Sequence, residues 1–401
     1  VAGSKATPTE PPKTRLLKTV AEYLPIFGLL CESDFTDLAE QLMDIFTHES
    51  LERVGVDNVF VKLERLIDWV AIGDRLGIVR HRLGRKGYDV DAMVRVLLLG
   101  QWHSLSDREL EHALRVRLDF MLFCGFDLYS SIPDHSTICR FRCALVEANL
   151  HEELLCLINA QLEGRGVKVS RASTAVVDAT IIESSARPRK WLDAEKVAED
   201  RLEPDLFDLR DSEEASSRIV TCQASDDAEF EEHLSVDGDA RWLKKGHRSY
   251  FGYKCFSRVD ESGFVEKALA RPANEGEQPH FPSLVVGSTA ERIMADKGMA
   301  SAANRQYLKA QGYKDGIMHR AARNRPLTSW QKVFNRLVSK KRWIVEQSYG
   351  TMKRRFDFRR ASYRGRAKVE AQMTYKAVCA NLLKAANMIV LTVTPGRMIT
   401  G

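Results

Sequence analysis

The amino-acid sequence predicts an α/β domain with a mixed five-stranded sheet and flanking helices, preceded by an all-α domain. Apolar residues recur at helical spacing up to about residue 160, and short β-branched runs begin near residue 172. A chain of 401 residues also exceeds the size at which one hydrophobic core stops growing. We place the boundaries at 1–19 (flexible leader), 20–165 (all-α domain), 170–368 (α/β domain) and 369–401 (C-terminal helix and tail).

The helical domain has well-marked helix starts. Ser106 and Glu109 form a capping-box pattern, and the next start falls at Asp134 or Ser136. Gly125 is placed to stop a helix between them. The segment therefore resembles two short helices flanking a turn, a helix-turn-helix arrangement that reads DNA in some proteins and is common packing in others.

The α/β domain is predicted from β-branched and alternating runs. A long polar insertion follows the first strand, and helical segments separate the later ones. A long helix begins at about Ser329. The predicted strands are 173–182, 249–259, 263–270, 292–296 and 316–319.

The formal net charge of +5 conceals two opposite blocks. Residues 193–240, within an insertion that we place at 190–245, carry 17 acidic and 4 basic residues. Residues 320–368 carry 16 Lys and Arg against 2 acidic residues. A basic block of this size is typical of a nucleic-acid partner. The acidic insertion is interpreted either as a solvated loop or as a segment that covers the basic block until DNA displaces it.

Composition excludes several classes of protein. No apolar run approaches the roughly 18 residues of a membrane helix. The eight cysteines include no CxxC pair, which favours a reducing compartment, so we expect the cytosol or nucleoid. Gly84 to Gly87 lacks the rest of a phosphate-binding loop, and we expect no small-molecule cofactor.

Three carboxylates are candidates for chemistry. Asp178 interrupts an apolar strand, where an unpaired carboxylate would be costly to bury. Asp296 ends a second strand, at the edge where ligands gather in α/β sheets. Glu346 shares a helix face with Arg342 and Lys353, since they are spaced by four and seven residues.

Each acid also has a plain structural interpretation. Asp178 would bond backbone amides or an arginine, Asp296 would end a turn, and Glu346 would pair with a neighbouring cation. Taken together, carboxylates from separate elements are what Mg²⁺ requires. Two such ions activate a water or a 3′-hydroxyl at phosphorus, while Arg342 and Lys353 contact the adjacent phosphates. The following arginines would extend a track along the DNA backbone: Arg354, Arg355, Arg359, Arg360, Arg364 and Arg366.

Four motifs around these residues carry a family resemblance. They are VVDATIIE at 176–183, YFGYK at 250–254, ADKG at 295–298 and VEQSYGTMKRRF at 345–356. They resemble the DDE transposases of the IS5 group of bacterial insertion sequences. Upstream, LSDRELE at 105–111 and PDHSTICRFR at 133–142 resemble the helical N-terminal domain of that family, so the similarity spans about residues 60–390.

The resemblance implies an RNase H-like catalytic domain and an Mg-dependent DNA transposase with endonuclease activity. Asp178, Asp296 and Glu346 would bind two Mg²⁺ ions, with Mn²⁺ as a substitute. Arg342, Glu346 and Lys353 match the Arg-x3-Glu-x6-Lys signature of the family. Two departures are Ser339, where relatives have Tyr, and 274–277, where relatives have a His-Asp pair after the Asn.

The expected partner is double-stranded DNA, as transposon ends and target, bound by a homodimer or higher homo-oligomer. In the helix-turn-helix-like segment we place DNA contacts at His135, Arg140 and Arg142. Two alternatives stay open: an inactive or domesticated DNA-binding descendant, and a structure-specific nuclease.

Overall fold

The computed structural model describes residues 50, 53–55, 57–78, 87–127, 130–186, 217–221, 229–233 and 236–389. These residues form two compact units. Of the described residues, the first unit contains those in 1–171, 264–266 and 375–389, and the second contains those in 172–263 and 267–374. The predicted leader and most of the acidic insertion lie outside the described residues.

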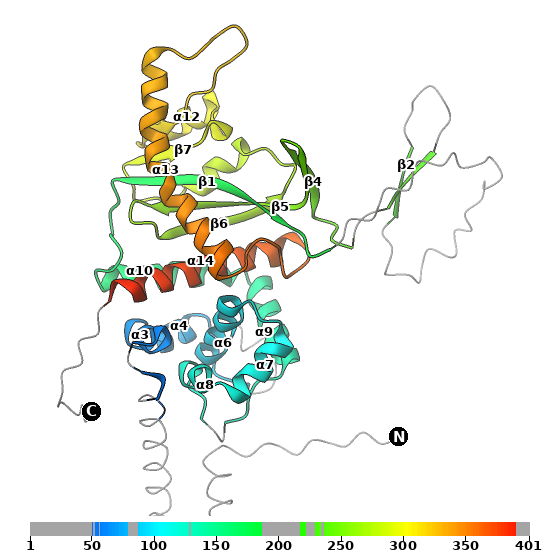
Figure 1. Ribbon diagram of the computed structural model, residues 1–401, viewed down its shortest axis with the longest axis vertical. Helices are drawn as coiled ribbons and strands as arrows, with labels where there is room; N and C mark the ends of the chain where they lie inside the picture. The colour runs from blue at the N-terminus through cyan, green and yellow to red at the C-terminus, as the bar shows by residue number, and fades with distance from the viewer. Residues whose placement is uncertain are drawn as a thin grey trace, which may run out of the picture. The chain divides into compact units, whose positions relative to one another are not determined.

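The first unit has a helical N-terminal region, as predicted (Figure 1). Its most buried helix is α6, in which Val94, Val96 and Leu99 are fully enclosed, because this helix is apolar on nearly every face. The helices are α3 (Val59–Leu66), α4 (Trp69–Arg75), α6 (Val90–His103), α7 (Asp107–Val116), α8 (Leu118–Cys124), α9 (His135–Glu147) and α10 (Leu150–Gly164).

The predicted helix boundaries around α7 and α9 are confirmed. Ser106 and Glu109 make both bonds of a capping box, and Asp134 caps α9 by accepting from the Thr137 backbone N–H. Gly125 ends α8 with a φ of 72°. The helix-turn-helix interpretation needs correction, because α8 occupies the connection between α7 and α9, which is much longer than a turn of three or four residues.

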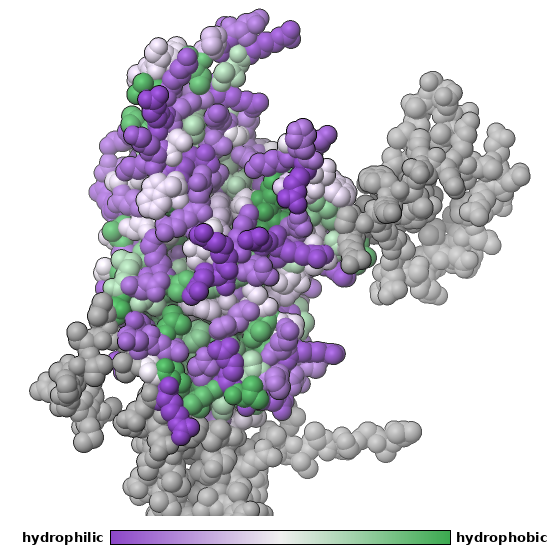
Figure 2. All heavy atoms as spheres, viewed as in Figure 1, coloured by the Kyte–Doolittle hydropathy of each residue, from purple (hydrophilic) through white to green (hydrophobic). Residues whose placement is uncertain are grey.

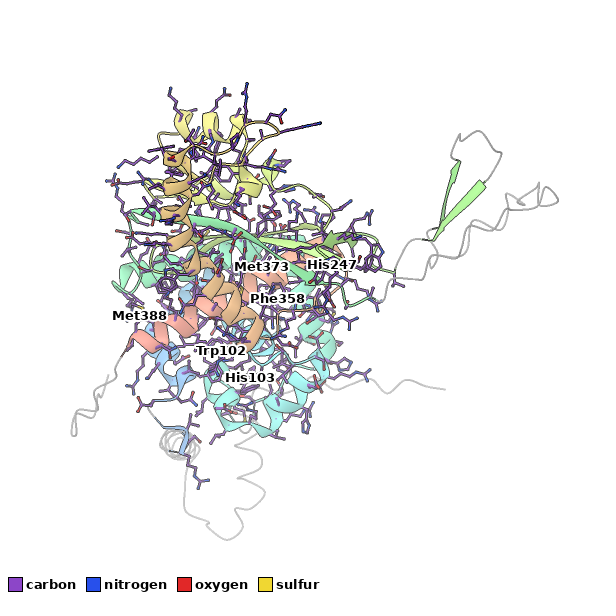
Figure 3. The ribbon with its side chains drawn as sticks, turned by 45° about the horizontal axis from the view of Figure 1, so that its top comes forward. Trp102, His103, His247, Phe358, Met373 and Met388 are labelled. Atoms are coloured by element: carbon purple, nitrogen blue, oxygen red, sulfur yellow. The ribbon has the colours of Figure 1, made fainter. Side chains whose placement is uncertain are left out.

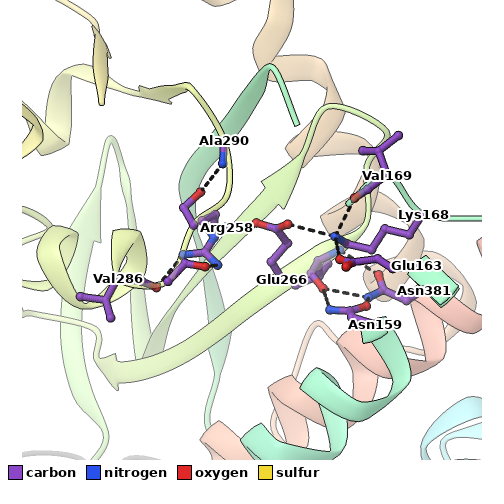
Figure 4. A network of polar contacts seen from close by, with 12 residues as sticks. Asn159, Glu163, Lys168, Val169, Arg258, Glu266, Val286, Ala290 and Asn381 are labelled. Atoms are coloured by element: carbon purple, nitrogen blue, oxygen red, sulfur yellow. Dashed lines mark hydrogen bonds and ion pairs between the residues drawn. The ribbon is translucent and has the colours of Figure 1, made fainter. Parts of the chain in front are cut away.

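Buried amides join distant parts of the first unit (Figure 4). The Asn381 side chain accepts from the Val265 backbone N–H at 2.8 Å and donates to the Val265 carbonyl and to Asn159. Asn159 donates to the same carbonyl at 3.0 Å. Asn381 belongs to α14 (Arg366–Met388), so the C-terminal half of that helix is part of this unit. Every one of these buried polar groups therefore has a partner.

The second unit is built on a mixed sheet with flanking helices. Its strand order is β4-β5-β1-β7-β8, with β6 also paired to β5. β1 is antiparallel to β5 and parallel to β7, which is parallel to β8. The strands are β1 (Thr174–Glu183), β4 (Arg241–Lys245), β5 (Arg248–Asp260), β6 (Val265–Pro272), β7 (Arg292–Ala295) and β8 (Lys314–Ile317).

The predicted count of five strands is wrong, because the described residues already form a sheet of six. The additional strand, β4, lies at the end of the range that we assigned to the acidic insertion. Four of its five residues are exposed, so it has no buried face to leave an apolar alternation in the sequence. Within the insertion, β2 (Ser217–Thr221) and β3 (Glu229–His233) form a separate antiparallel pair.

The two faces of the sheet differ in chemistry, because successive side chains of a strand point to opposite faces. Val177 and Phe256 join a buried apolar cluster with Phe281 and Leu284 of α11 (Phe281–Val285). The neighbouring residue, Asp178, contacts α13 (Ser329–Arg355) instead. Short helices η2 (Gln278–His280), η3 (Lys297–Met299) and α12 (Ala302–Ala310) complete this unit.

The ends of the elements are fixed by buried anchors. Phe358, which follows α13 and is labelled in Figure 3, is fully buried. Asp237, just before β4, is 1% exposed and accepts hydrogen bonds from Ser184, Tyr253 and Gly365.

No helix among the described residues is both long and apolar enough to cross a membrane.

Candidate active site

Asp178 and Asp296 lie on neighbouring parallel strands. Val177 of β1 is in register with Ala295 of β7, so the residues that follow each, Asp178 and Asp296, stand side by side where β7 ends. β1 continues to Glu183, beyond the end of its parallel partner. Asp296 therefore lies at the carboxyl edge of the parallel strands, as the sequence predicted, and Asp178 lies beside it within the longer β1.

Arg342 of α13 joins these two carboxylates. Its Nη2 donates to Oδ2 of Asp178 at 2.6 Å, and its Nη1 lies 3.4 Å from Oδ1 of Asp296. Burial alone would lower the pKa of Arg342, but the charges of Asp178, Asp296 and Glu346 raise it overall. The negative charges of all three candidate acids therefore stabilise the protonated form of the Arg342 guanidinium.

Asp178 is the most enclosed of the three acids, with a side chain 13% exposed. Burial raises its pKa, the Arg342 guanidinium opposes that rise, and the charge of Asp296 adds to it. Its Oδ1 accepts from the Ala179 backbone N–H at 2.9 Å. The carboxylate is thus held by an arginine and an amide, in agreement with the plain structural interpretation, while it also faces a second acid.

Glu346 lies one helical turn after Arg342 and is exposed. In the parts of the chain that the structure describes, no three His, Cys, Asp or Glu side chains converge closely enough to hold a metal ion. The donor set still fits a hard divalent cation, because it consists of carboxylate oxygens. Arg342 places a positive charge between the carboxylates of Asp178 and Asp296.

The predicted face of α13 contacts β1 at two further points. The Tyr349 hydroxyl donates to the backbone carbonyl of Asp178 at 2.7 Å. The Lys353 ammonium donates to Thr180 Oγ1 at 2.5 Å and to the Ile181 carbonyl at 3.3 Å. Three residues of one helix face therefore fix the part of β1 that carries Asp178.

Cations gather around Lys353. Burial lowers the pKa of Lys353, and the charges of Lys245 and Arg359 lower it further, against an opposing effect of Cys255. Lys245 ends β4, a strand that sequence reasoning placed in the acidic insertion. No sequence signal linked Lys245 to the basic block, because only the pairing of β4 with β5 brings it there.

The candidate arginines from the last turn of α13 to the start of α14 are exposed, and hydrophilic side chains cover most of the region over α13 in the view of Figure 2. Arg360 donates to the carbonyls of Ser184 and Ser185, which ties this segment to the end of β1. Among the described residues, Arg354 bonds the Gly350 carbonyl of its own helix. The exposed arginines are Arg354, Arg355, Arg359, Arg360, Arg364 and Arg366.

The three predicted DNA contacts in the N-terminal helical region differ in their exposure to solvent. Arg142 is buried and makes a two-pronged ion pair with Asp107, so it links α9 to α7 and does not face a phosphate. We therefore withdraw Arg142 as a DNA contact. His135 is exposed and bonds Glu111, and Arg140 is exposed and bonds side chains of its own helix.

Sequence reasoning missed a fourth acid at this site. Burial raises the pKa of Glu277, and the charges of Asp178 and Asp296 raise it further, while Lys254 opposes the rise. The Lys254 ammonium lies 3.8 Å from Oε1 of Glu277. Lys254 belongs to the 250–254 motif and Glu277 to a segment noted as a departure, but their spacing gave no sign that they meet.

Comparisons with known proteins agree with this geometry. Residues 173–382 match the family described as "Transposase DDE domain", and residues 48–144 match "Transposase domain (DUF772)". The transposase for insertion sequence element IS1106 of Neisseria meningitidis serogroup B is 43% identical over 251 residues, which cover 62% of this chain and 78% of that relative. No solved structure matches.

The fold and site define a DNA-processing enzyme built on a mixed sheet. The chain belongs to the DDE transposases of insertion sequences.

Proposed function

We propose that this chain is the transposase of an IS5-group element. It binds the terminal inverted repeats of the element as a homodimer or higher homo-oligomer. It then cleaves the ends of the element and joins the freed 3′-hydroxyl to target DNA. Its second unit is proposed to be RNase H-like. The observation that carries the proposal is the Arg342 guanidinium between Asp178 and Asp296, with Glu346 one turn away.

The proposed metal ligands are Asp178, Asp296 and Glu346. When bound, two Mg²⁺ or Mn²⁺ ions would supply activation of the attacking oxygen and stabilisation of the leaving oxygen. Asp178 is held in place for this role by the Ala179 backbone N–H, and Asp296 by the Lys297 backbone N–H. The protein therefore contributes oxygens of fixed position.

The proposed phosphate contacts surround these acids. Arg342 presents a planar pair of donors suited to phosphate oxygens, and Lys353 lies beside Thr180 further along β1. We include Lys245 among the proposed phosphate contacts because its charge lowers the pKa of Lys353, which places the two cations near each other. The exposed arginines from the last turn of α13 to the start of α14 would follow the DNA backbone and give binding a strong salt dependence.

The test uses the full chain with labelled element ends and Mg²⁺ or Mn²⁺, and scores binding, nicking and strand joining. Asp296→Asn keeps an oxygen for the Lys297 backbone N–H but removes the charge. We expect it to abolish nicking and joining while binding persists.

The matched control is Asp357→Asn. Asp357 is exposed, lies in the basic block and has a φ of 48°, which Asn tolerates. This variant should retain nicking and joining. Cleavage without joining would instead favour a nuclease, and binding without either reaction a non-catalytic descendant.

A further inference from the structure

The sheet of the second unit extends into a two-stranded ribbon. β1 pairs with β5 as far as Gly252, and the Ser184 backbone N–H still donates to the Phe251 carbonyl at 2.9 Å. Before that point, the described residues place only β4 beside β5. Residues 241–250 are therefore a β-hairpin that extends beyond the main sheet, and we call it the β4–β5 ribbon.

A two-residue turn closes the ribbon. Lys245 lies opposite Arg248, so only Gly246 and His247 connect the two strands. Gly246 has a φ of 62°, the left-handed conformation that tight hairpin turns require and that glycine adopts without strain. His247, labelled in Figure 3, marks this end of the ribbon. The ribbon is thus a regular hairpin with a defined turn.

Both faces of the ribbon are exposed. Eight of the nine residues in 241–249 are exposed to solvent. On one face the rings of Trp242 and Phe251 lie together, with centroids 5.4 Å apart. On the other face the Arg248 guanidinium lies 5.8 Å from the centroid of the Tyr250 ring. A strand pair is normally stabilised by burying one face, so a hairpin that buries neither has the form of an element that receives a partner.

The ribbon is strongly basic. It contains four Lys or Arg and no Asp or Glu, and the chain has no acidic residue between Asp239 and Asp260. The four cations are all exposed and come from both faces: Arg241, Lys244, Lys245 and Arg248. An anionic partner suits this surface, whereas pairing with the same surface of a second copy would bring like charges together.

One face of the ribbon is continuous with the face of the sheet that carries the acids. Ser257 lies opposite Asp178, and Phe251 is an even number of residues away on the same strand, so Phe251 and its partner Trp242 share the face of Asp178. Glu183, where β1 ends, follows Asp178 by five residues, a span of roughly 17 Å. DNA with its end at the acids therefore reaches the ribbon about five base pairs further on.

We propose that the β4–β5 ribbon inserts, turn first, into the major groove of the DNA whose end lies at Asp178, Asp296 and Glu346. This inference rests on the proposed function, which supplies that duplex. With the turn at the floor of the groove, the two faces of the ribbon meet the two phosphate backbones that line it. The arrangement accounts for cations on both faces.

The dimensions of the ribbon fit the major groove. Sheets pack about 10 Å apart, so a strand pair with its side chains is about 10 Å thick, and the groove is about 12 Å wide. The five residues of β4 span roughly 17 Å, which exceeds the groove depth of about 8.5 Å. The minor groove, about 6 Å wide, is too narrow. Arg248, beside the turn, is then placed to donate to guanine N7.

The competing explanation is that these cations only keep an exposed edge strand from pairing with other chains. The two explanations differ in what a reversal of charge does. Lys244→Glu combined with Arg248→Glu keeps the edge charged, so protection against aggregation persists. The same double variant repels DNA.

The test is protection of guanine N7 from dimethyl sulfate in a labelled duplex that carries the terminal repeat of the element, since N7 lies in the major groove. The full chain is used without divalent metal, so that DNA is bound but not cleaved. The native chain should protect guanines within about one helical turn of the cut. The double variant should lose that protection and bind the duplex at least about ten-fold more weakly.

The matched control is Lys309→Glu. Lys309 is exposed on α12, whose Tyr307 and Leu308 pack against the apolar cluster on the opposite face of the sheet from Asp178. This control reverses a charge in the same unit but away from the proposed path of the DNA. It should keep the native protection and the native affinity.

The outcomes separate the ribbon from the proposed function. Loss of protection and affinity in the double variant, with an unchanged melting temperature, supports insertion into the groove. Weaker affinity with intact protection would place the ribbon on phosphates outside the groove and overturn the proposal, as would native affinity. If the double variant does not fold, Arg248→Gln takes its place, and intact protection there has the same meaning. A native chain that does not bind the terminal repeat would refute the proposed function itself.

Discussion

The Arg342 guanidinium donates to the Asp178 carboxylate at 2.6 Å, across 164 residues of sequence. The same guanidinium lies 3.4 Å from Asp296, so one side chain of α13 neutralises acids from two strands. The Asp178 side chain is only 13% exposed, so its charge would be costly to bury without such a partner. The bond therefore determines how the long helix lies on the sheet.

Arg342→Gln should destabilise the protein in the absence of metal. Removing one partner of a largely buried ion pair leaves the other charge uncompensated, which costs about 3 kcal/mol. Mg²⁺ should raise the melting temperature of this variant more than that of the native chain, since the cation then neutralises Asp178 and Asp296. Differential scanning fluorimetry with and without Mg²⁺ measures both effects.

Arg354→Gln is the matched control for Arg342. Arg354 is exposed on the same helix and bonds only its own backbone, so its loss should change stability by less than about 0.5 kcal/mol. Equal losses in the two variants would show that the link to Asp178 contributes nothing to folding.

DNA binding should weaken at alkaline pH through Lys353. Burial lowers the pKa of Lys353 below its ordinary value of 10.5, so it loses its proton earlier than an exposed lysine as pH rises. Lys353→Arg stays charged throughout and should make the affinity for a labelled duplex less dependent on pH. Fluorescence anisotropy at low salt, from neutral to alkaline pH, measures the difference.

The same pKa has the opposite consequence for folding. Because the folded chain binds fewer protons at Lys353 than the unfolded chain, this residue makes stability rise as pH increases from its folded pKa to 10.5. In Lys353→Arg that rise should be absent. Identical pH profiles for the variant and native chains, in both binding and unfolding, would contradict the assignment.

Asp237→Ala should be among the most destabilising single changes in the second unit. It removes the acceptor of bonds from Ser184, Tyr253 and Gly365 and leaves three donors at a buried site, at a cost of about 3 kcal/mol or more. Urea unfolding measures the loss. The control Asp239→Ala removes one exposed bond, to the Arg366 backbone N–H, and should cost about 1 kcal/mol.

Gly252→Ala should disrupt the pairing of β1 with β5. A Cβ there would lie 2.2 Å from the Ile182 carbonyl and 2.8 Å from the Ser184 nitrogen, both backbone atoms that cannot move aside freely. We expect a loss of a few kcal/mol, roughly the upper range of single substitutions. Gly164→Ala at the end of α10 meets nothing within 4 Å and should be nearly neutral in the same unfolding measurement.

Patterns within short stretches of the sequence were sufficient to predict much of the fold. The capping box at Ser106 needs only residues three apart, and the 27-residue helix that begins at Ser329 places Arg342, Tyr349 and Lys353 on one face by its geometry alone. The mixed sheet and the position of Asp296 after a short strand were likewise predictable. The capping box and the helix face depend on residues within a few positions of each other, whereas the mixed sheet follows from the order of strands and helices along the chain.

Pairings between distant elements were decided only by the tertiary structure. β4 has no buried face and so no apolar alternation in its sequence. Arg142, which the sequence predicts to contact DNA, pairs with Asp107. Glu277 meets Lys254 and Gly298 from separate segments. A charged residue looks the same in sequence whether it faces solvent, an ion pair or a substrate. Its role depends on which partners the fold brings within a few ångströms, because electrostatic and hydrogen-bond energies act over distances in space.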